Sequence, residues 1–379
     1  MKIINIDYAG HPFIYELSKK LAKKHVVYHC FADFFFSPKA NLINKKSLRI
    51  VPIKSKTKFI KNHFLSRRRI EINFGHSVIQ IIRNIKPDLI ICAQIPLDPL
   101  ENILNFTKNS SIKSIYWVQD IYSEAIKKII NKKIPILGSL LGFYYKRKEI
   151  SCQDKSDKII IITKAFQKYI SKKNKKKINF VENWSALSKP KNKLIKSFNQ
   201  KFKFKKKIIA IYSGTLGYKH NVNFFLNLAN KYKEVIFILS SEGYFADEIN
   251  VKKKELGLKN LKVIDWVNYK DFSSFLSIAD LYIVILSADA STFSVPSKIY
   301  SYLLMKKHIL ASMPKNNLGS KNIVNFKSGY VSEPNDNETL YKNFDKIINK
   351  IKLKKKISNN YSFLKKKNLN KVIKIIEKF

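Results

Sequence analysis

Two short stretches in the second half of the sequence have the residue types that bind phosphate groups. The first, residues 212–221 (YSGTLGYKHN), follows a strand-like run and precedes a helical pattern, and it contains Gly214, Gly217 and Lys219. Glycine lets backbone N–H groups approach an anion closely, and the N-terminus of the following helix adds free N–H groups. Lys219 would add a point charge. An ordinary strand-to-helix turn is the competing interpretation.

The second stretch, residues 295–301 (VPSKIYS), follows another apolar run. Pro296 suits the first turn of a helix, and Ser297 can satisfy the free N–H groups there. Lys298 is electrostatically unfavourable at a helix N-terminus, and a bound anion would remove that conflict. A lysine on a solvated face is the alternative. Both stretches are expected at one edge of the same sheet, where they can hold the two ends of a nucleoside diphosphate.

The elements that position these loops form two repeats of one pattern. Continuously apolar runs at residues 2–7, 88–93, 113–118 and 158–162 alternate with helical patterns, and the alternation restarts after residue 206. Such strands indicate parallel sheets covered on both faces, and therefore an α/β protein with two doubly wound domains. Ligands in such sheets bind beyond the carboxyl ends of the strands.

The domain boundaries are predicted from a break in this rhythm. Residues 183–206 contain Pro190 and many lysines, which predicts an interdomain linker with a surface lead-in. We therefore expect a first domain at residues 1–185, a second at 186–357 and a C-terminal helix at 358–379 that packs back on the first domain.

The charge of the chain is strongly positive. Lysine and arginine number 73 against 27 acidic residues, for a net charge of +46, but only six of the basic residues are arginines. Proteins that read bases or clamp phosphates favour the planar arginine fork, so we predict no nucleic-acid partner and favour a basic surface facing anionic lipid. A nucleic-acid binder remains the alternative, and it would show a steep salt dependence of binding.

Several features bear on compartment and membrane contact. Three widely spaced cysteines and an acidic residue as early as Asp7 predict a cytoplasmic chain without a signal peptide. Residues 134–145 (IPILGSLLGFYY) are apolar with basic flanks but too short to cross a bilayer. They predict either an interfacial segment or a buried helix. The phenylalanines at 34–36 are open to the same two interpretations.

The order of the motifs resembles a known family. Matching stretches lie at residues 10–12 (GHP), 118–124 (VQDIYSE), 181–184 (VENW), 212–217 (YSGTLG), 295–298 (VPSK), 309–311 (ILA) and 329–334 (GYVSEP), followed by Asp336. They cover nearly the whole chain and are similar to those of retaining glycosyltransferases of family four, in the branch that builds bacterial surface polysaccharides. The resemblance implies the GT-B fold, in which two Rossmann-like domains face a central cleft.

The resemblance also implies site residues. Gly214, Thr215 and Lys219 match the loop that binds the donor diphosphate, together with Gly217, and Ser297 and Lys298 match the loop that holds the donor phosphates and sugar. Gly10 and His11 match a first-domain loop near the acceptor, and Asp120 falls where that branch carries an acidic residue facing the cleft. We expect Asp120 or His11 to orient the acceptor hydroxyl, as a base. A helix-capping role is the preferred alternative for His11.

The sequence departs from the family at one motif. Ser301 and Phe293 stand where two glutamates are usual, and Ser301 can still donate a hydrogen bond to a donor hydroxyl. Asp289 is a candidate replacement for the missing carboxylate. The loss of both glutamates keeps open a second function, a catalytically inactive paralogue that binds a nucleotide sugar.

The resulting prediction is a retaining glycosyltransferase, of hexosyl or N-acetylhexosaminyl type. The donor is expected to be a UDP-linked sugar, and with no D-x-D triplet in the chain we expect no metal or other cofactor. The predicted acceptor is a saccharide on a lipid diphosphate, in the synthesis of lipopolysaccharide or a related surface polysaccharide. The expected location is the inner face of the cell membrane, as a peripheral protein on its anionic surface.

Overall fold

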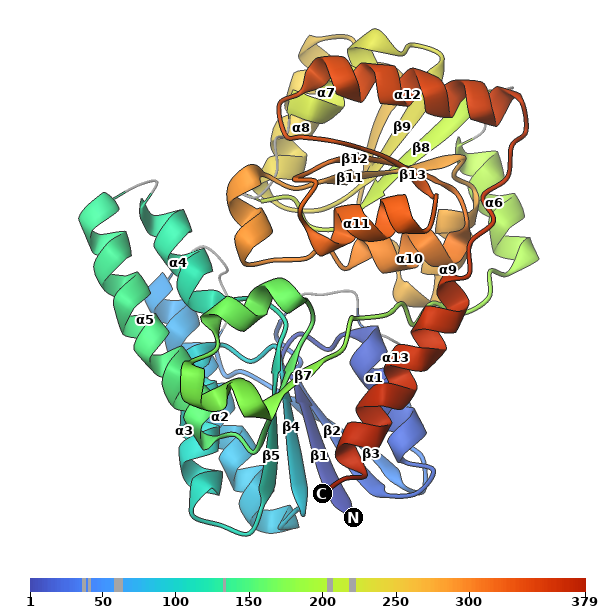
Figure 1. Ribbon diagram of the computed structural model, residues 1–379. Helices are drawn as coiled ribbons and strands as arrows, with labels where there is room; N and C mark the ends of the chain where they lie inside the picture. The colour runs from blue at the N-terminus through green and yellow to red at the C-terminus, as the bar shows by residue number, and fades with distance from the viewer. Residues whose placement is uncertain (36–38, 40–41, 58–63, 132–133, 203–206, 218–222) are drawn as a thin grey trace. The chain divides into compact units, whose positions relative to one another are not determined.

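The chain forms two compact units that are each built around a parallel sheet (Figure 1). The computed structural model describes residues 1–379 except 36–38, 40–41, 58–63, 132–133, 203–206 and 218–222. Unit 1 comprises Met1–Asn183 together with Lys366–Phe379, and unit 2 comprises Trp184–Lys365.

The sheet of unit 1 has the strand order β3-β2-β1-β4-β5-β6-β7, and its strands are parallel. The strands are β1 (Lys2–Asp7), β2 (Val26–Ala32), β3 (Leu48–Ile53), β4 (Leu89–Ala93), β5 (Lys113–Val118), β6 (Lys158–Ile161) and β7 (Ile178–Phe180). Ile6 of β1 is paired with Cys30 of β2 and with Cys92 of β4. All three are completely buried, as expected for central strands covered on both faces.

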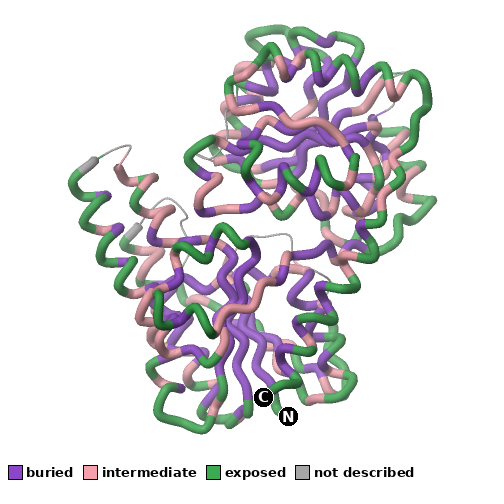
Figure 2. Tube along the Cα trace, in the orientation of Figure 1, coloured by how far each residue is buried: buried purple, intermediate pink, exposed green. Residues whose placement is uncertain are grey.

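Helices flank this sheet and present exposed outer faces (Figure 2). They are α1 (Pro12–Leu21), α2 (Phe64–Ile85), α3 (Leu97–Lys108), α4 (Tyr122–Asn131) and α5 (Pro135–Lys155), with the 3₁₀ turns η1 (Lys164–Tyr169) and η2 (Lys172–Lys177). Proline occupies the first turn of α1 and of α5, where its missing N–H group breaks no helical hydrogen bond.

Unit 2 repeats the plan with the strand order β10-β9-β8-β11-β12-β13. Its strands are β8 (Ile208–Ser213), β9 (Val235–Ser240), β10 (Leu261–Ile264), β11 (Leu281–Ile285), β12 (His308–Ser312) and β13 (Gly329–Ser332). Its helical segments are α6 (Asn192–Phe202), α7 (Asn223–Lys231), α8 (Tyr244–Glu255), α9 (Tyr269–Ser277), η3 (Ala288–Thr292), α10 (Lys298–Met305), α11 (Leu318–Asn325) and α12 (Asn337–Lys352).

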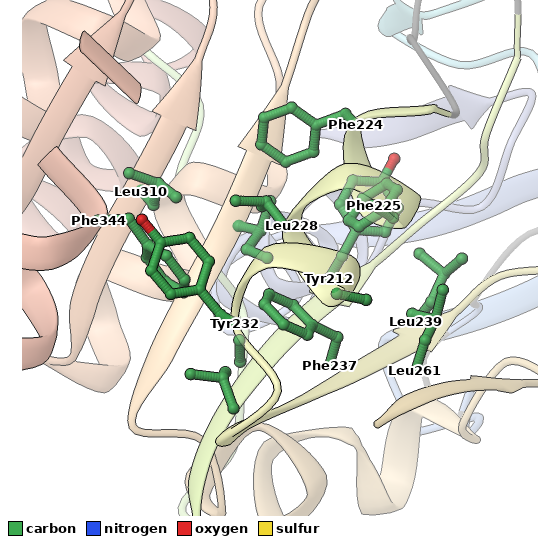
Figure 3. Packing of buried hydrophobic residues seen from close by; sticks show 14 of the residues in the cluster. Tyr212, Phe224, Phe225, Leu228, Tyr232, Phe237, Leu239, Leu261, Leu310 and Phe344 are labelled. Atoms are coloured by element: carbon green, nitrogen blue, oxygen red, sulfur yellow. The ribbon is translucent and has the colours of Figure 1, made fainter. Parts of the chain in front are cut away.

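An aromatic core fixes one face of this second sheet (Figure 3). Tyr232 meets Phe344 of α12 edge to face at 4.4 Å between ring centroids, and Tyr212 of β8 meets Phe225 of α7 at 5.0 Å. Such aromatic pairs stabilise a core beyond the burial of their area. The end of β8, and therefore the loop that follows it, has a rigid base.

The strand orders define a switch point in each sheet, where the connections change direction. It lies between β1 and β4 in unit 1, and between β8 and β11 in unit 2. Loops that leave the carboxyl ends of such strand pairs line the usual ligand-binding crevice of an open α/β sheet. The loops after β1 and β4, and those after β8 and β11, are therefore the candidate ligand-binding loops of the two sheets.

The predicted class, α/β with two doubly wound parallel sheets, is confirmed. One local prediction was wrong. Residues 192–202, expected within a linker, form α6, because Phe198 and Phe202 pack on Phe275 of α9.

The C-terminal helix α13 (Tyr361–Ile376) contributes to both units. Its residues from Lys366 onward group with unit 1. There Lys158 donates a hydrogen bond to the Ile375 carbonyl at 2.8 Å, and its ammonium lies 3.6 Å from the centre of the Phe379 ring. A cation at a helix C-terminus interacts favourably with the helix dipole.

Candidate functional site

The loop after β8 is held by hydrogen bonds from neighbouring elements of unit 2. Gly214 has a φ of +137°, which residues with a side chain rarely adopt, and its N–H donates to the Ser240 carbonyl at 3.0 Å. The Ser213 N–H donates to the Tyr302 hydroxyl of α10 at 3.0 Å. The Tyr212 hydroxyl donates to the Thr215 carbonyl at 3.1 Å. The loop is therefore preorganised before any ligand binds.

Lys298 lies directly against this loop. A Cβ atom built on Gly214 would be 2.9 Å from the Lys298 Nζ, so glycine is needed for the ammonium group to lie there. The Nζ is 3.5 Å from the centre of the Tyr212 ring. It is buried, and among the described residues no hydrogen-bond acceptor contacts it.

The surroundings of Lys298 indicate a site for an anion. Burial holds its pKa well below its usual range. Within the described part of the chain, this buried ammonium has the Tyr212 ring face and the Gly214 backbone beside it and lacks the hydrogen bonds that buried charges need. A phosphate oxygen at this position would supply the missing acceptor and favour the charged form.

The other predicted phosphate ligands are placed unevenly. Thr215 is exposed, and a Cβ on Gly217 would meet no atom of the described residues within 4 Å. Lys219 lies outside the described residues. Ser297 is exposed at the start of α10, and its side chain makes no capping hydrogen bond, contrary to the prediction.

The replacements for the family's glutamates differ in their surroundings. Ser301 Oγ lies 3.1 Å from Ser185 Oγ, within hydrogen-bond distance, and Phe293 is buried. Asp289 is exposed in η3. The structure therefore brings Gly214, Tyr212 and Lys298 together, with Ser301 one helical turn after Ser297.

A second cluster lies at the switch point of unit 1. Asp7 at the end of β1 is completely buried, and its Oδ1 lies 2.9 Å from the Nδ1 of His11, whose backbone N–H also bonds to Asp7. Gly10 makes the turn between them with a φ of +71° and a hydrogen bond to the Asp7 carbonyl. His11 is the residue before α1, but its side chain makes no capping hydrogen bond. His11 is thus the N-cap residue of α1, as the alternative interpretation expected, although its side chain takes no part in the cap.

The electrostatics of this cluster make His11 more basic. Burial alone would lower its pKa, but the negative charge and hydrogen bond of Asp7, with the charge of Asp120, outweigh it and raise the pKa. The side chain keeps 27% of its surface exposed. With Nδ1 occupied by Asp7, the Nε2 atom remains to exchange a proton with a substrate hydroxyl.

Asp120 belongs to the same edge of the sheet. It follows β5, and its Oδ2 accepts a hydrogen bond from the Gln94 side chain at 3.5 Å. Gln94, directly after β4, has a positive φ of 49°. Asp7 therefore holds His11 and Gly10, Gln94 contacts Asp120, and the charge of Asp120 acts on His11.

Sequence reasoning missed Asp7, Gln94 and Tyr212. The spacing of Asp7 and His11, four residues apart across a strand end and a glycine turn, was a usable signal for a carboxylate–histidine pair. No sequence signal joined Tyr212 to Lys298, because that contact depends on how α10 packs beside β8. Among the described residues, no group of three or more His, Cys, Asp or Glu side chains is placed to hold a metal ion.

Comparisons with known proteins support the fold. No protein-family model and no curated protein match the chain. HepE of Anabaena, in complex with UDP and glucose, matches with a TM-score of 0.70 and 13% identity over 100% of both chains. Sucrose-phosphate synthase of Thermosynechococcus elongatus matches with a TM-score of 0.70 and 11% identity, over 98% of this chain and 94% of the other.

A third similar structure is that of an epimerase. UDP-GlcNAc 2-epimerase of Neisseria meningitidis, bound to UDP-GlcNAc, matches with a TM-score of 0.62 and 13% identity over 100% of both chains. At such identities the likeness shows the fold, and one fold can carry several functions. The predicted GT-B fold, with two doubly wound α/β domains in one chain, is confirmed.

Proposed function

We propose that the protein is a nucleotide-sugar glycosyltransferase. The single observation that carries the proposal is the buried ammonium of Lys298 against the Gly214 backbone, at the switch point of the second sheet, where no described residue supplies it with a hydrogen-bond acceptor. A diphosphate fits this position because it brings several hydrogen-bond acceptors and negative charge to one place.

The proposed donor is a UDP-linked sugar, bound by unit 2. HepE and the epimerase, which share the fold, have been solved with UDP or UDP-GlcNAc. Lys298 and the backbone of residues 214–217 would hold the diphosphate, and the hydroxyls of Thr215, Ser297 and Ser301 would contact the phosphates, ribose or sugar. We propose that Lys219 adds a second positive charge.

The proposed chemistry is sugar transfer with retention of configuration, as in the family that the motifs resemble. The bond between the anomeric carbon and the diphosphate oxygen breaks, and its electron pair passes to the diphosphate. The acceptor oxygen bonds the same face of that carbon, and its proton passes to a base. We assign the base to His11, oriented by Asp7, with Asp120 and Gly10 near the acceptor hydroxyl.

Stabilising the departing diphosphate is the main demand on the protein. Negative charge grows on that group as the bond breaks, and fixed positive groups in a water-poor site lower the barrier without having to reorganise. A single such group typically contributes about 3 kcal/mol, or roughly a hundredfold in rate.

The proposed acceptor is a saccharide carried on a lipid diphosphate, in the synthesis of lipopolysaccharide or a related surface polysaccharide. The resemblance of the ordered motifs, the net charge of +46 and the apolar segment at residues 134–145 support this acceptor. The protein would then act at the inner face of the cell membrane as a peripheral protein, with no nucleic-acid partner.

A non-catalytic nucleotide-sugar binder is the second candidate, because Ser301 and Phe293 replace two glutamates and Ser301 lies beside Ser185. Calorimetry with a panel of nucleotide sugars, followed by assays of hydrolysis and transfer with any sugar that binds, separates the candidates. Glycosyltransferase function predicts binding and slow hydrolysis without acceptor. Binding without turnover supports the second candidate, conversion to an epimer indicates an epimerase, and no binding at all contradicts the proposal.

A further inference from the structure

The first half of α5 presents an apolar face to solvent. Ile136, Leu140 and Phe143 are 78%, 64% and 58% exposed, and their spacing of four and three residues places them on one side of the helix. Leu137 and Tyr144, seven residues apart, extend this face and are also exposed. We call these five side chains the α5 apolar face. The sequence left open whether this segment is buried, and the structure shows that this face is not.

The opposite side of α5 is firmly packed within unit 1. A Cβ on Gly142 would lie 2.7 Å from the Cβ of Lys127, so α4 and α5 run in close contact, as Figure 1 also shows. The Tyr145 hydroxyl donates to Asp98 at 3.1 Å, and Lys148 forms an ion pair with Asp98 at 2.7 Å. The exposure of the α5 apolar face is therefore a property of a well-anchored helix and does not result from fraying.

Basic residues adjoin this face. Lys146 and Arg147 are exposed at its C-terminal end, and the Arg147 guanidinium lies 4.6 Å from the centre of the Phe143 ring. The sequence from residue 134 to residue 148 contains no acidic residue. Apolar side chains next to cationic ones match the boundary between acyl chains and anionic headgroups.

We propose that the α5 apolar face docks the protein on the surface of a bilayer that contains anionic lipid. From Ile136 to Arg147 the helix is about 17 Å long, against a hydrocarbon core of about 30 Å, so it lies in the interface and does not cross. No helix in the described parts of the chain combines the length and apolar character that a crossing needs. The inference deepens the proposed function, because docking would bring unit 1 to a lipid-carried acceptor.

The charge favours a bilayer over a second copy of the chain. Two copies that paired through α5 would bring together molecules of net charge +46, whereas anionic headgroups supply the opposite sign. The other aromatic cluster considered for membrane contact is engaged elsewhere. Phe34 and Phe35 pack on Tyr8 at 6.0 and 5.2 Å between ring centroids, and Phe36 lies outside the described residues.

Vesicle sedimentation of the full-length protein tests the proposal. Wild-type protein should bind vesicles of phosphatidylglycerol and phosphatidylcholine in equal parts, and bind phosphatidylcholine alone much less. The double variant Leu140→Glu/Phe143→Glu should lose at least about tenfold in vesicle affinity, because two carboxylates replace apolar side chains in the interface. Val251→Glu, at an exposed apolar position of α8 in unit 2, is the matched control and should bind as wild type does.

Two further measurements separate docking from other effects. A fluorophore on Leu140→Cys should shift to the blue with anionic vesicles, and the same label on Val251→Cys should not. Cys30, Cys92 and Cys152 are buried, so labelling is selective. Calorimetry with UDP should give the same affinity for the Glu double variant and wild type. Equal affinities would show that the two substitutions leave the proposed donor site unchanged.

Three results would overturn the proposal. The first is that the Glu double variant binds anionic vesicles as tightly as wild type does. The second is an equal fluorescence shift for the labels at positions 140 and 251. The third is that wild type does not bind vesicles but self-associates, and that the Glu double variant abolishes this self-association.

Discussion

Lys298 and His11 illustrate how surroundings assign a role to a common residue type. Lysine is so frequent in this chain that its presence at position 298 says little, but a buried Nζ beside Gly214 and the Tyr212 ring distinguishes it from solvated lysines. His11 is likewise defined by a buried carboxylate, Asp7, that fixes its Nδ1. Both residues combine burial with a specific neighbour, which is typical of functional sites.

Removing the carboxylate of Asp7 should make His11 less basic. Asp7 raises the pKa of His11, so in Asp7→Asn burial dominates and the pKa falls below that of an ordinary histidine. An NMR titration of the His11 ring measures this directly. In a working transferase, the acidic limb of the kcat/KM profile should move to lower pH by the same amount. Asp33→Asn, at an exposed position, is the control, and an unchanged titration in Asp7→Asn would refute the pairing.

Single-residue roles were only partly accessible from the sequence. Gly214 and Lys298 were selected because loop glycines and a lysine at a helix start are local patterns. The contact between them spans 84 positions and depends on the packing of α10 against β8, which no local pattern records. The predicted capping role of Ser297 failed because this residue, directly before α10, has helical backbone angles and not the extended ones of a usual N-cap.

At the scale of elements, the pair α4 and α5 is fastened by one buried carboxylate. Glu149 of α5 accepts hydrogen bonds from the Tyr122 N–H at 2.9 Å and from the Ser123 hydroxyl at 2.5 Å, both in the first turn of α4. The Glu149 carboxylate therefore satisfies an N–H group and an O–H group at the start of α4. The start of α4 comes directly after the segment that carries Asp120. Burial nevertheless raises the pKa of Glu149 to about 7, against the opposing effect of these hydrogen bonds.

This raised pKa predicts a pH dependence of stability. Between the unfolded value near 4.5 and about 7 the folded state holds a proton that the unfolded state releases, so the free energy of unfolding falls as pH rises. The full difference is about 3 kcal/mol at most. Glu149→Gln lacks this titration, so its melting temperature should fall less than that of wild type between pH 5 and pH 8. Equal falls would contradict this prediction, and Glu255→Gln, at an exposed position of α8 in unit 2, should behave as wild type does.

The strands were predictable because parallel strands that are covered on both faces are apolar throughout. Most helices were predictable because their patterns alternate with these apolar runs. The strand expected at residues 2–7 is β1, and the strand expected at 113–118 is β5. Residues 192–202 were misjudged because lysines dominate their composition, and their two phenylalanines gain a partner only from α9. The sequence also left open which side of α5 is covered, since an apolar helix has several faces that could be buried.

At the scale of the whole molecule, the chain returns to its first unit at the C-terminus. Val372 and Ile376 of α13 are completely buried, and Lys24 forms an ion pair with Glu377 at 2.9 Å. Residues at opposite ends of the sequence therefore stabilise one unit. The sequence analysis expected two domains and a C-terminal helix that packs back on the first, but no local pattern indicated which residues would make these contacts.

Truncating a buried side chain of α13 should destabilise unit 1 selectively. Ile376→Ala removes a completely buried side chain and should cost about 2–5 kcal/mol. In a denaturant titration followed by hydrogen exchange, amides of unit 1 should lose protection while those of unit 2 keep it. Phe363→Ala, 68% exposed on the same helix, is the control. Equal loss of protection in both units would contradict the assignment of this segment to unit 1.

The affinity of UDP for wild type and for Lys298→Ala, measured by calorimetry, tests the central claim most directly. Lys254→Ala, an exposed lysine of α8 in the same unit, is the matched control. The loss of one charged hydrogen bond predicts an affinity at least about tenfold weaker for Lys298→Ala, with folding unchanged and the control equal to wild type. Equal affinities of wild type and Lys298→Ala for UDP would contradict a diphosphate site at this residue.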